Sequence, residues 1–418
     1  MSLDKTLTRR IFVGGAALAA GAAARKPAKA APMPTPRVVG ANDRLRVGVI
    51  GAGGNAKGHM KALMGLAEQD HLEIAAVCDI YQPRREKAAE LTGGEPYSDY
   101  RRLLERKDLD YVTISVPEHW HAQITLDAAD LGLHIYCEKP LTYSIEEGVK
   151  VRKRIHEGGI KLQVGIQGMS DDSYETAAQY IKDGAIGKPV MAQIDYSRNH
   201  LDDFWARPAD EDAQPGVNLD WKTFLGSAPQ REWAPDRFFG WRRYWDYSGG
   251  IAPDLFVHRL ARIVKACELK TPERVVTTGG MHYFKETKAE VPDTFNTMLE
   301  YQGGFSVLLV SSLASEAKIR HMIRGHEGSL EFVPGGFEIT PERLFKETRK
   351  PITHTRSGGE DMSLHHHNLH NAIRHGEALK CDVDVGFYAS MACQMAVESY
   401  RRREYLAWDA ASENLTTA

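Results

Sequence analysis

The pattern of apolar positions divides the chain into two parts. Between residues 45 and 167, short apolar runs rich in β-branched residues alternate with longer helical stretches. Such runs are typical of strands buried on both faces, and their alternation with helices is typical of βαβ units in a parallel sheet. The pattern predicts strands at 45–50, 72–79, 109–117, 134–140 and 161–167, with helices at 56–68, 121–132 and 144–159.

A different pattern follows in the second half of the chain. Residues 295–312 and 318–340 have the alternation of strands that are joined by glycine-containing turns. The 418 residues are enough for two domains with ordinary cores. We therefore expect a parallel α/β sheet followed by a second domain that is rich in strands.

The first predicted strand ends in a cluster of small residues. The run "VGVIGAGGNA" fits the G-x-G-x-x-G/A pattern with Gly51, Gly53 and Ala56. In that pattern the first glycine permits a tight turn, the second lets a pyrophosphate approach the backbone, and the third small residue lets helix and strand pack closely. A P-loop is excluded because His59, and not Lys, follows Gly58. The strand–loop–helix context favours a dinucleotide.

The choice of dinucleotide depends on the end of the second strand. Asp79 stands there, where a carboxylate can accept hydrogen bonds from the ribose hydroxyls of the adenosine. Arg84 and Arg85 follow closely and could accept a 2′-phosphate instead. The sequence favours NAD, leaves NADP open, and keeps a turn or cap residue as the alternative for Asp79.

The N-terminus predicts an export signal. Arg9-Arg10 and Ile11-Phe12 precede a weakly hydrophobic Ala/Gly run and then Ala28-Lys29-Ala30, which together resemble a twin-arginine signal with its cleavage site. We expect a signal peptide at 1–30, a linker at 31–43 and a periplasmic or other extracytoplasmic location. The alternative is an amphipathic N-terminal helix, which the Ala/Gly run disfavours because it lacks a polar face.

Composition narrows the function classes. A net charge of −3 gives no basic surface for nucleic acid, and no apolar run reaches the roughly 18 residues that a membrane span requires. The five cysteines contain no C-x-x-C pair and so indicate neither a zinc site nor a disulfide framework. His366 and His370 are spaced i, i+4, but spacing fixes no third ligand. There we expect a helix start over the domain interface and no metal.

Several motifs together resemble one family. The segments "GVIGAGGNAKGH", "AVCDIY", "VPEHWHA", "YCEKPL", "QVGIQ" and "SGGIAPDLFVH" are similar to those of the glucose-fructose oxidoreductase / inositol dehydrogenase / rhizopine-catabolism (Gfo/Idh/MocA) family, over about residues 44–410. The resemblance implies a Rossmann domain at 44–167 and, at 168–418, an α+β domain with a large, mostly antiparallel open sheet. It also implies a homo-oligomer, dimer or tetramer, formed through that sheet.

The resemblance implies catalytic residues as well. It places Lys139 at both nicotinamide and substrate, where an ammonium stabilises the charge that develops as an alcohol is oxidised. It places Asp254 and His258 at the substrate hydroxyl, whose proton the imidazole would take; the alternative is an N-cap Asp254 with His258 buried behind it. The residues expected to bind the cofactor are Gly51, Gly53, Gly54, Asn55, Ala56, Asp79, Pro117, His119, His121, Glu138 and Lys139, and those expected to bind the substrate are Gln167, Arg198, Asn199, Trp241 and Arg242.

An aromatic segment points to a carbohydrate. Residues 204–245 hold five of the seven tryptophans, at positions 205, 221, 233, 241 and 245. Aromatic faces suit the apolar faces of pyranose rings, and Arg198, Asn199, Arg242 and Arg243 could donate to hydroxyls or to a carboxylate. We expect the cluster to face a sugar, with core packing as the alternative for any single tryptophan.

These observations predict an exported enzyme that transfers a hydride between a sugar or polyol hydroxyl and a nicotinamide cofactor. Because free NAD is scarce outside the cytoplasm, we expect the cofactor to stay tightly bound and to be recycled within each turnover. The family offers two precedents: oxidation of one sugar coupled to reduction of another, and an NAD-dependent glycosidase of the α-N-acetylgalactosaminidase type that oxidises, eliminates, hydrates and reduces. A non-catalytic sugar-binding protein is the third alternative, and the intact Lys139, Asp254 and His258 argue against it.

Overall fold

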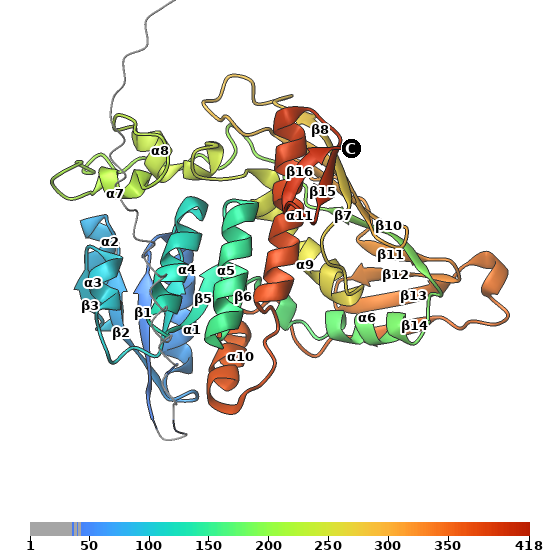
Figure 1. The fold of residues 1–418 in the computed structure, drawn as a ribbon, viewed down its shortest axis with the longest axis horizontal. Helices are drawn as coiled ribbons and strands as arrows, with labels where there is room; N and C mark the ends of the chain where they lie inside the picture. The colour runs from blue at the N-terminus through green and yellow to red at the C-terminus, as the bar shows by residue number, and fades with distance from the viewer. Residues whose placement is uncertain (1–35, 37–39, 41–42) are drawn as a thin grey trace, which may run out of the picture. The chain divides into compact units, whose positions relative to one another are not determined.

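The first sheet is parallel and has six strands (Figure 1). The structure, a computed structural model, describes residues 36, 40 and 43–418, so the predicted signal at 1–30 and most of the predicted linker lie outside the described residues. In sheet order the strands are β3 (Glu95–Tyr97), β2 (Leu72–Cys78), β1 (Leu45–Ile50), β4 (Tyr111–Ile114), β5 (His134–Glu138) and β6 (Leu162–Gly165).

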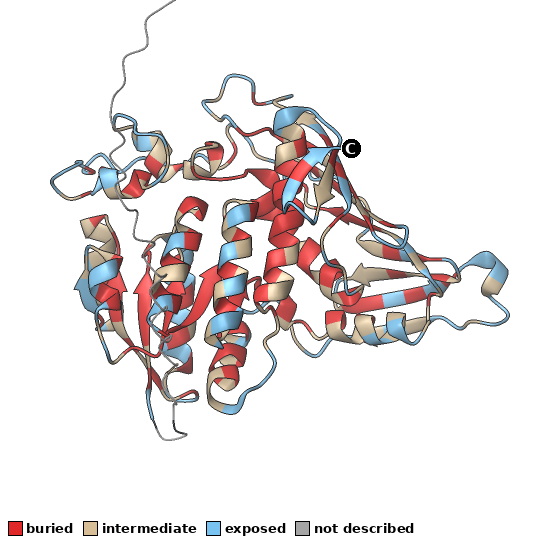
Figure 2. Cartoon of the chain, in the orientation of Figure 1, coloured by how far each residue is buried: buried red, intermediate tan, exposed pale blue. Residues whose placement is uncertain are grey.

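The central strands of this sheet are buried along their whole length. Every residue of β4, β5 and β6 is buried, as the apolar runs predict for strands that are covered on both faces (Figure 2). Ser144 begins α5 with a capping box to Glu147. The helical elements of this part are α1 (Gly54–Leu66), α2 (Gln82–Thr92), α3 (Tyr100–Leu104), η1 (Glu118–Trp120), α4 (His121–Asp130), α5 (Ile145–Gly158) and η2 (Gln167–Ser170).

The second sheet has ten strands and is mostly antiparallel. β7 and β10 form a parallel pair, whereas the other described pairings of this sheet are antiparallel. In sheet order the strands are β14 (Ile352–Thr355), β13 (Gly336–Pro341), β12 (Gly328–Val333), β11 (Met322–Gly325), β7 (Pro189–Asp195), β10 (Phe305–Ser312), β9 (Thr294–Tyr301), β8 (Arg274–Gly280), β15 (Leu406–Asp409) and β16 (Asn414–Thr417). The predicted fold class, a Rossmann sheet followed by a large and mostly antiparallel sheet, is therefore confirmed.

The end of the chain returns to the first sheet. α10 packs against α1, and α11 packs against α5 and α9. α11 approaches β6 closely at Gly386, where a Cβ would lie 2.3 Å from a methyl carbon of Val164. The remaining helical elements are α6 (Ser173–Lys182), α7 (Trp221–Leu225), α8 (Pro235–Phe239), η3 (Trp241–Arg243), the π-helical η4 (Ala252–Phe256), α9 (Val257–Ala266), η5 (Arg343–Phe345), α10 (Met362–His375) and α11 (Val383–Arg402).

None of these helices, in the part of the chain that the structure describes, is both long enough and apolar enough to cross a bilayer.

Candidate functional site

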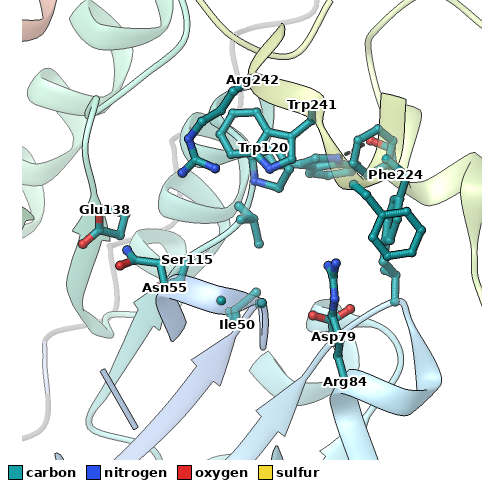
Figure 3. A pocket seen from close by; sticks show the side chains of 18 of the residues that line it. Ile50, Asn55, Asp79, Arg84, Ser115, Trp120, Glu138, Phe224, Trp241 and Arg242 are labelled. Atoms are coloured by element: carbon teal, nitrogen blue, oxygen red, sulfur yellow. Dashed lines mark hydrogen bonds between the residues drawn. The ribbon is translucent and has the colours of Figure 1, made fainter. Parts of the chain in front are cut away.

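A cavity of about 880 Å³ opens at the carboxyl ends of the parallel strands (Figure 3). Its lining includes Gly51 after β1, Asp79 after β2, Ser115 after β4 and Glu138 at the end of β5. Residues of the second half of the chain, from Arg198 to His258, line it from the other side. Its volume is that of a site for a cofactor or small molecule, and its place is where open parallel sheets bind ligands.

The glycines of the first loop have different roles. Gly51 has φ +88°, and a Cβ there would lie 2.4 Å from the carbonyl oxygen of Ser115, so the protein itself requires glycine. At Gly53 a Cβ would meet only a guanidinium nitrogen of Arg84, at 3.8 Å, and at Gly54 it would meet nothing within 4 Å. The space beside Gly53 therefore belongs to the cavity, as expected where a ligand approaches the backbone.

The first turn of α1 suits an anionic group. Gly53 is its N-cap and provides no side-chain hydrogen bond, and the first turn carries no acidic residue. The free N–H groups and the positive end of the helix dipole therefore stay available to a phosphate. Ala56, the third small residue of the pattern, is fully buried. The loop fits the pyrophosphate of a dinucleotide.

Asp79 is fixed beside the glycine loop. Its Oδ2 accepts a hydrogen bond from the Ala52 amide and its Oδ1 one from the Tyr81 amide, both at 2.8 Å. Burial raises the pKa of its carboxyl, and the positive charge of Arg84 acts in the opposite direction. The Arg84 guanidinium lies over the rings of Phe238 and Phe239, 5.0 and 5.4 Å from their centroids.

Lys139, Asp254 and Arg242 form one ionic cluster. Lys139 Nζ donates to Asp254 Oδ1 at 2.7 Å and to its carbonyl oxygen at 3.0 Å, and Arg242 Nε donates to the same Oδ1 at 3.0 Å. Burial alone would raise the pKa of Asp254, but these two cations hold it well below its usual range. Asp254 is therefore ionised, and both cations share one of its oxygens.

His258 lies beside this cluster in the first turn of α9. It lines the cavity, and its Nδ1 is buried without a hydrogen-bond partner among the described residues. Burial, together with the positive charge of Lys139, lowers the pKa of His258 to about 3. Its imidazole is therefore neutral at physiological pH and can accept a proton. Asp254 precedes it in the π-helical turn η4.

Most of the predicted site residues line the cavity. Ala56, His119, His121 and Asn199 do not. His119 Nε2 pairs with the carbonyl of Phe224 at 2.8 Å, and both ring nitrogens of His121 pair with backbone carbonyls, so these imidazoles hold loops. The predicted residues that line the cavity are Gly51, Gly53, Gly54, Asn55, Asp79, Pro117, Glu138, Lys139, Gln167, Arg198, Trp241, Arg242, Asp254 and His258.

The aromatic segment divides between cavity and core. Trp205 and Trp241 line the cavity. Trp221 stacks on Phe224 at 5.0 Å, with Trp233 against it, and the ring of Trp245 lies 6.1 Å from that of Tyr400. Core packing, the alternative for any single tryptophan, thus describes three of the five.

Residues 204–247, which we name the strap, tie the second half of the chain to loops of the Rossmann sheet (Figure 1). Gln82 N donates to the carbonyl of Asn218 at 2.8 Å, and Asp220 N donates to the carbonyl of Ile80 at 3.1 Å. On the other side of the cavity, Trp120 Nε1 donates to the carbonyl of Phe224 at 2.9 Å. The strap therefore spans the Asp79 end of the cavity.

The histidines near residue 366 belong to a buried network. His59 Nε2 lies 3.0 Å from Glu138 Oε1, and His59 Nδ1 lies 2.9 Å from His366 Nε2. Burial alone would raise the pKa of Glu138, but its hydrogen bonds and the nearby positive charge lower it to about 2. His370 pairs with Asp70 at 2.5 Å. No group of three or more potential metal ligands occurs within the described ranges.

Glu118 is a residue that the sequence analysis missed. It is fully buried, accepts a hydrogen bond from Ser248 Oγ at 2.7 Å, and accepts another from the Gly249 amide at 2.9 Å. Burial, with the negative charge of Asp254 as the next cause, raises its pKa to about 7. Glu118 ties η1 to the turn that precedes Asp254. The available signal was a carboxyl directly after Pro117, at the carboxyl end of a strand.

Two family models match the chain. Residues 45–166 match the Gfo/Idh/MocA model described as "Oxidoreductase family, NAD-binding Rossmann fold", and residues 223–331 match the "GFO/IDH/MocA C-terminal domain". Together these matches span more than half of the chain.

Three relatives show how far the likeness extends. A scyllo-inositol 2-dehydrogenase (NAD(+)) of Bacillus subtilis is 32% identical over 40% of this chain and 47% of its own length, so the alignment spans about half of that relative. A glycosyl hydrolase family 109 protein of Shewanella pealeana is 36% identical over 31% of this chain and 29% of its own length. A levoglucosan dehydrogenase of Pseudarthrobacter phenanthrenivorans is 25% identical over 87% of this chain and 97% of its own.

The fold also resembles that of a solved structure. A levoglucosan dehydrogenase in complex with NADH and levoglucosan has a TM-score of 0.68, with 20% identity over 87% of this chain and 99% of that one. At this identity the likeness concerns the fold.

We expect substitutions of Gly51 and Gly53 to affect different properties, stability for Gly51 and ligand binding for Gly53. Gly51→Ala forces a Cβ against Ser115 in a left-handed conformation, so we expect a loss of about 1–3 kcal/mol in the free energy of unfolding. Gly53→Val places its side chain in the cavity, so we expect near-normal stability and at least about tenfold weaker dinucleotide binding, which corresponds to about 1.4 kcal/mol. Urea unfolding and calorimetric titration with NAD measure the two effects. Unchanged NAD affinity in Gly53→Val would contradict the phosphate assignment.

Glu118 predicts a pH-dependent stability. The pKa of Glu118 is about 7 in the folded protein, which is higher than that of an unfolded glutamate. Its contribution to the free energy of unfolding is therefore fully present below about pH 4.5 and is lost as pH rises through 7. The loss amounts to about 3 kcal/mol. Glu118→Gln removes this titration, so its free energy of unfolding should improve relative to that of the unmodified protein between pH 5 and 8.

Urea unfolding at four pH values across this range measures the difference. The matched control is Glu338→Gln, which changes an exposed glutamate. Parallel pH profiles for the unmodified protein and Glu118→Gln would show that Glu118 does not titrate in this range.

Proposed function

Because the chain belongs to the Gfo/Idh/MocA oxidoreductase family, we propose that it is an exported NAD(P)-dependent enzyme that acts on a hydroxyl of a sugar or polyol. The observation that carries this proposal is the cluster of Lys139, Asp254 and His258 in the same cavity as the glycine loop. The names of the inositol and levoglucosan dehydrogenases support the substrate class. The Arg9-Arg10 pair supports export.

The residues around the cavity fit a nicotinamide dinucleotide. The amides of the α1 N-terminus would hold the pyrophosphate, Asp79 the adenosine ribose, and Glu138 with Lys139 the nicotinamide end. When bound, this cofactor supplies the acceptor or donor of the hydride. The carboxylate of Asp79 disfavours a 2′-phosphate through charge repulsion, so we propose NAD ahead of NADP.

The chain's own residues then account for the acid–base chemistry. His258 is neutral and has an unpaired Nδ1, so it can take the proton of the reacting hydroxyl. Lys139, held by Asp254, places a fixed positive charge where the oxygen becomes negative. Arg242 shares Asp254 with Lys139 and so limits how far that carboxylate neutralises the lysine.

We further propose that the cofactor stays bound between turnovers. The strap closes over the Asp79 end of the cavity and contacts the loops after β2 and β4. A dinucleotide covered in this way would leave slowly, which suits a compartment where free NAD is scarce. Homo-oligomerisation through the ten-stranded sheet remains a proposal that rests on the family resemblance.

The second candidate function is a redox-neutral glycosidase. The glycosyl hydrolase family 109 relative favours it, at 36% identity over a short segment. Such an enzyme needs the same retained cofactor, base and lysine, so the cavity fits both candidates. The products separate them, because a dehydrogenase yields an oxidised sugar and a glycosidase yields a hydrolysed glycoside.

The proposal predicts turnover without added cofactor. The purified and desalted protein should release a nicotinamide dinucleotide on denaturation, which mass spectrometry identifies. It should convert sugar pairs or aryl glycosides with no NAD supplied. Lys139→Ala and His258→Ala should each lower turnover by about 100-fold or more, since they remove a charge stabiliser and a general base, while the cofactor stays bound.

Two results would contradict parts of this proposal. Full activity of His258→Ala would remove the base assignment. A strict need for millimolar external NAD would indicate an ordinary dissociable dehydrogenase and would overturn the retention argument. An exposed-residue variant, Glu338→Gln, serves as the control for both activity and cofactor content.

A further inference from the structure

Positive charge exceeds negative charge around His258. The cavity lining on this side holds two carboxylates and four cationic side chains: Glu138 and Asp254, with Lys139, Arg198, Arg207 and Arg242. Both carboxylates are already engaged, Glu138 by His59 and Asp254 by two of the cations. The excess positive charge therefore belongs to Arg198 and Arg207.

Arg198 and Arg207 have no ion pair with a carboxylate within the described residues. The nearby Asp203 pairs instead with Arg243, at 3.2 Å. Arg198 lies over the ring of Tyr196, with 5.2 Å from Cζ to the centroid, and its hydrogen bond to Tyr196 Oη is long, at 3.4 Å. Both arginines are exposed, so a ligand can reach them.

Arg198 is linked to His258 through Tyr196, and Arg207 lines the same cavity. The ring of Tyr196, under Arg198, lies 6.0 Å from the ring of His258. Burial and the positive charges of Arg198 and Arg207 lower the pKa of His200, so both guanidinium groups act on the same imidazole. A ligand whose hydroxyl meets His258 therefore has the guanidinium of Arg198 near it, and that of Arg207 in the same cavity.

A guanidinium without a carboxylate partner at a binding cavity suits an anion on the ligand. Its planar fork matches a carboxylate in two parallel hydrogen bonds, and such charge-assisted bonds are the stronger kind. A neutral sugar offers only hydroxyls, which leave this charge unmatched. A phosphate would satisfy the same fork, and the experiment below distinguishes it from a carboxylate.

We propose that the substrate carries a carboxylate, as a uronic acid or its glycoside does, and that Arg198, with Arg207 beside it, binds this group while His258 and Lys139 face the reacting hydroxyl. This inference rests on the proposed function. It narrows the sugar to an anionic one and assigns the anion to a pair of arginines outside the Lys139–Asp254–Arg242 cluster.

The test uses sugars that differ at one carbon. Desalted protein is assayed with glucose, glucuronate and glucose 6-phosphate and with the corresponding galactose and mannose series, each together with a ketose that accepts the hydride and restores the bound cofactor. The 4-nitrophenyl glycosides are assayed alone, and the absorbance of the bound cofactor is followed throughout. We expect kcat/KM for the accepted uronate to exceed that of its neutral partner by about 10- to 100-fold, the scale of a charged hydrogen bond. Added salt should raise the KM of the uronate.

Variants assign the effect to the arginines. Arg198→Gln should bring the ratio of uronate to neutral kcat/KM toward one, and Arg207→Gln should lower the same ratio to a smaller extent. The matched control, Arg343→Gln, changes an exposed arginine in η5 and should leave the ratio as it is. Thermal stabilisation by uronate, measured without turnover, should be lost in Arg198→Gln and kept in the control.

The outcomes distinguish a failure of the carboxylate assignment from a failure of the proposed function. Equal or better use of neutral sugars, or an unchanged ratio in Arg198→Gln, overturns the carboxylate assignment and leaves the proposed function standing. A preference for the 6-phosphates overturns the carboxylate in favour of a phosphate. Failure of every sugar to change the bound cofactor overturns the proposed function, and this inference with it.

Discussion

The two halves of the chain meet in one buried ionic cluster, and the site depends on it. Lys139 comes from the end of the Rossmann sheet, whereas Arg242 and Asp254 come from η3 and η4 of the second half. Removing one member of a buried pair leaves an uncompensated charge, at a cost of about 3–5 kcal/mol. The cluster therefore holds the second half of the chain where His258 can face the cavity. Glu118 holds the turn that precedes Asp254 through its hydrogen bonds with Ser248 and Gly249.

Packing and hydrogen bonds hold the irregular strap in place. Its five-residue helices α7 and α8 have too few turns to be stable alone, so their order comes from packing. Trp221, Phe224 and Phe238 form a small core there. Hydrogen bonds to Ile80 and Gln82 then attach the segment to the Rossmann sheet. The strap is therefore attached to the Rossmann sheet through Asn218, Asp220 and Phe224 and is packed around its own aromatic side chains.

Local patterns allowed the parallel sheet and the glycine loop to be predicted from sequence. The strand at 45–50 and the turn at Gly51 follow from apolar runs and from one backbone requirement, and both are visible in a window of ten residues. The roles of His119 and His121 were not predictable, because the sequence around a histidine at a strand end does not show whether its ring contacts a ligand or a distant backbone carbonyl. His119 contacts a carbonyl that lies 105 residues away in the chain. Glu118 was missed for the same reason, because its partners Ser248 and Gly249 lie 130 and 131 residues further along the chain.

The histidines of α10 illustrate the same limit on a larger scale. Their spacing places the side chains on one face of the helix, and a metal ion is only one of the partners that could bind them there. In the structure His366 on α10 contacts His59 on α1, and His59 contacts Glu138, so α10 supports the carboxylate that precedes Lys139. Glu138 is engaged by His59 and Asp254 by its two cations, so the guanidinium groups of Arg198 and Arg207 are left without a carboxylate partner among the described residues.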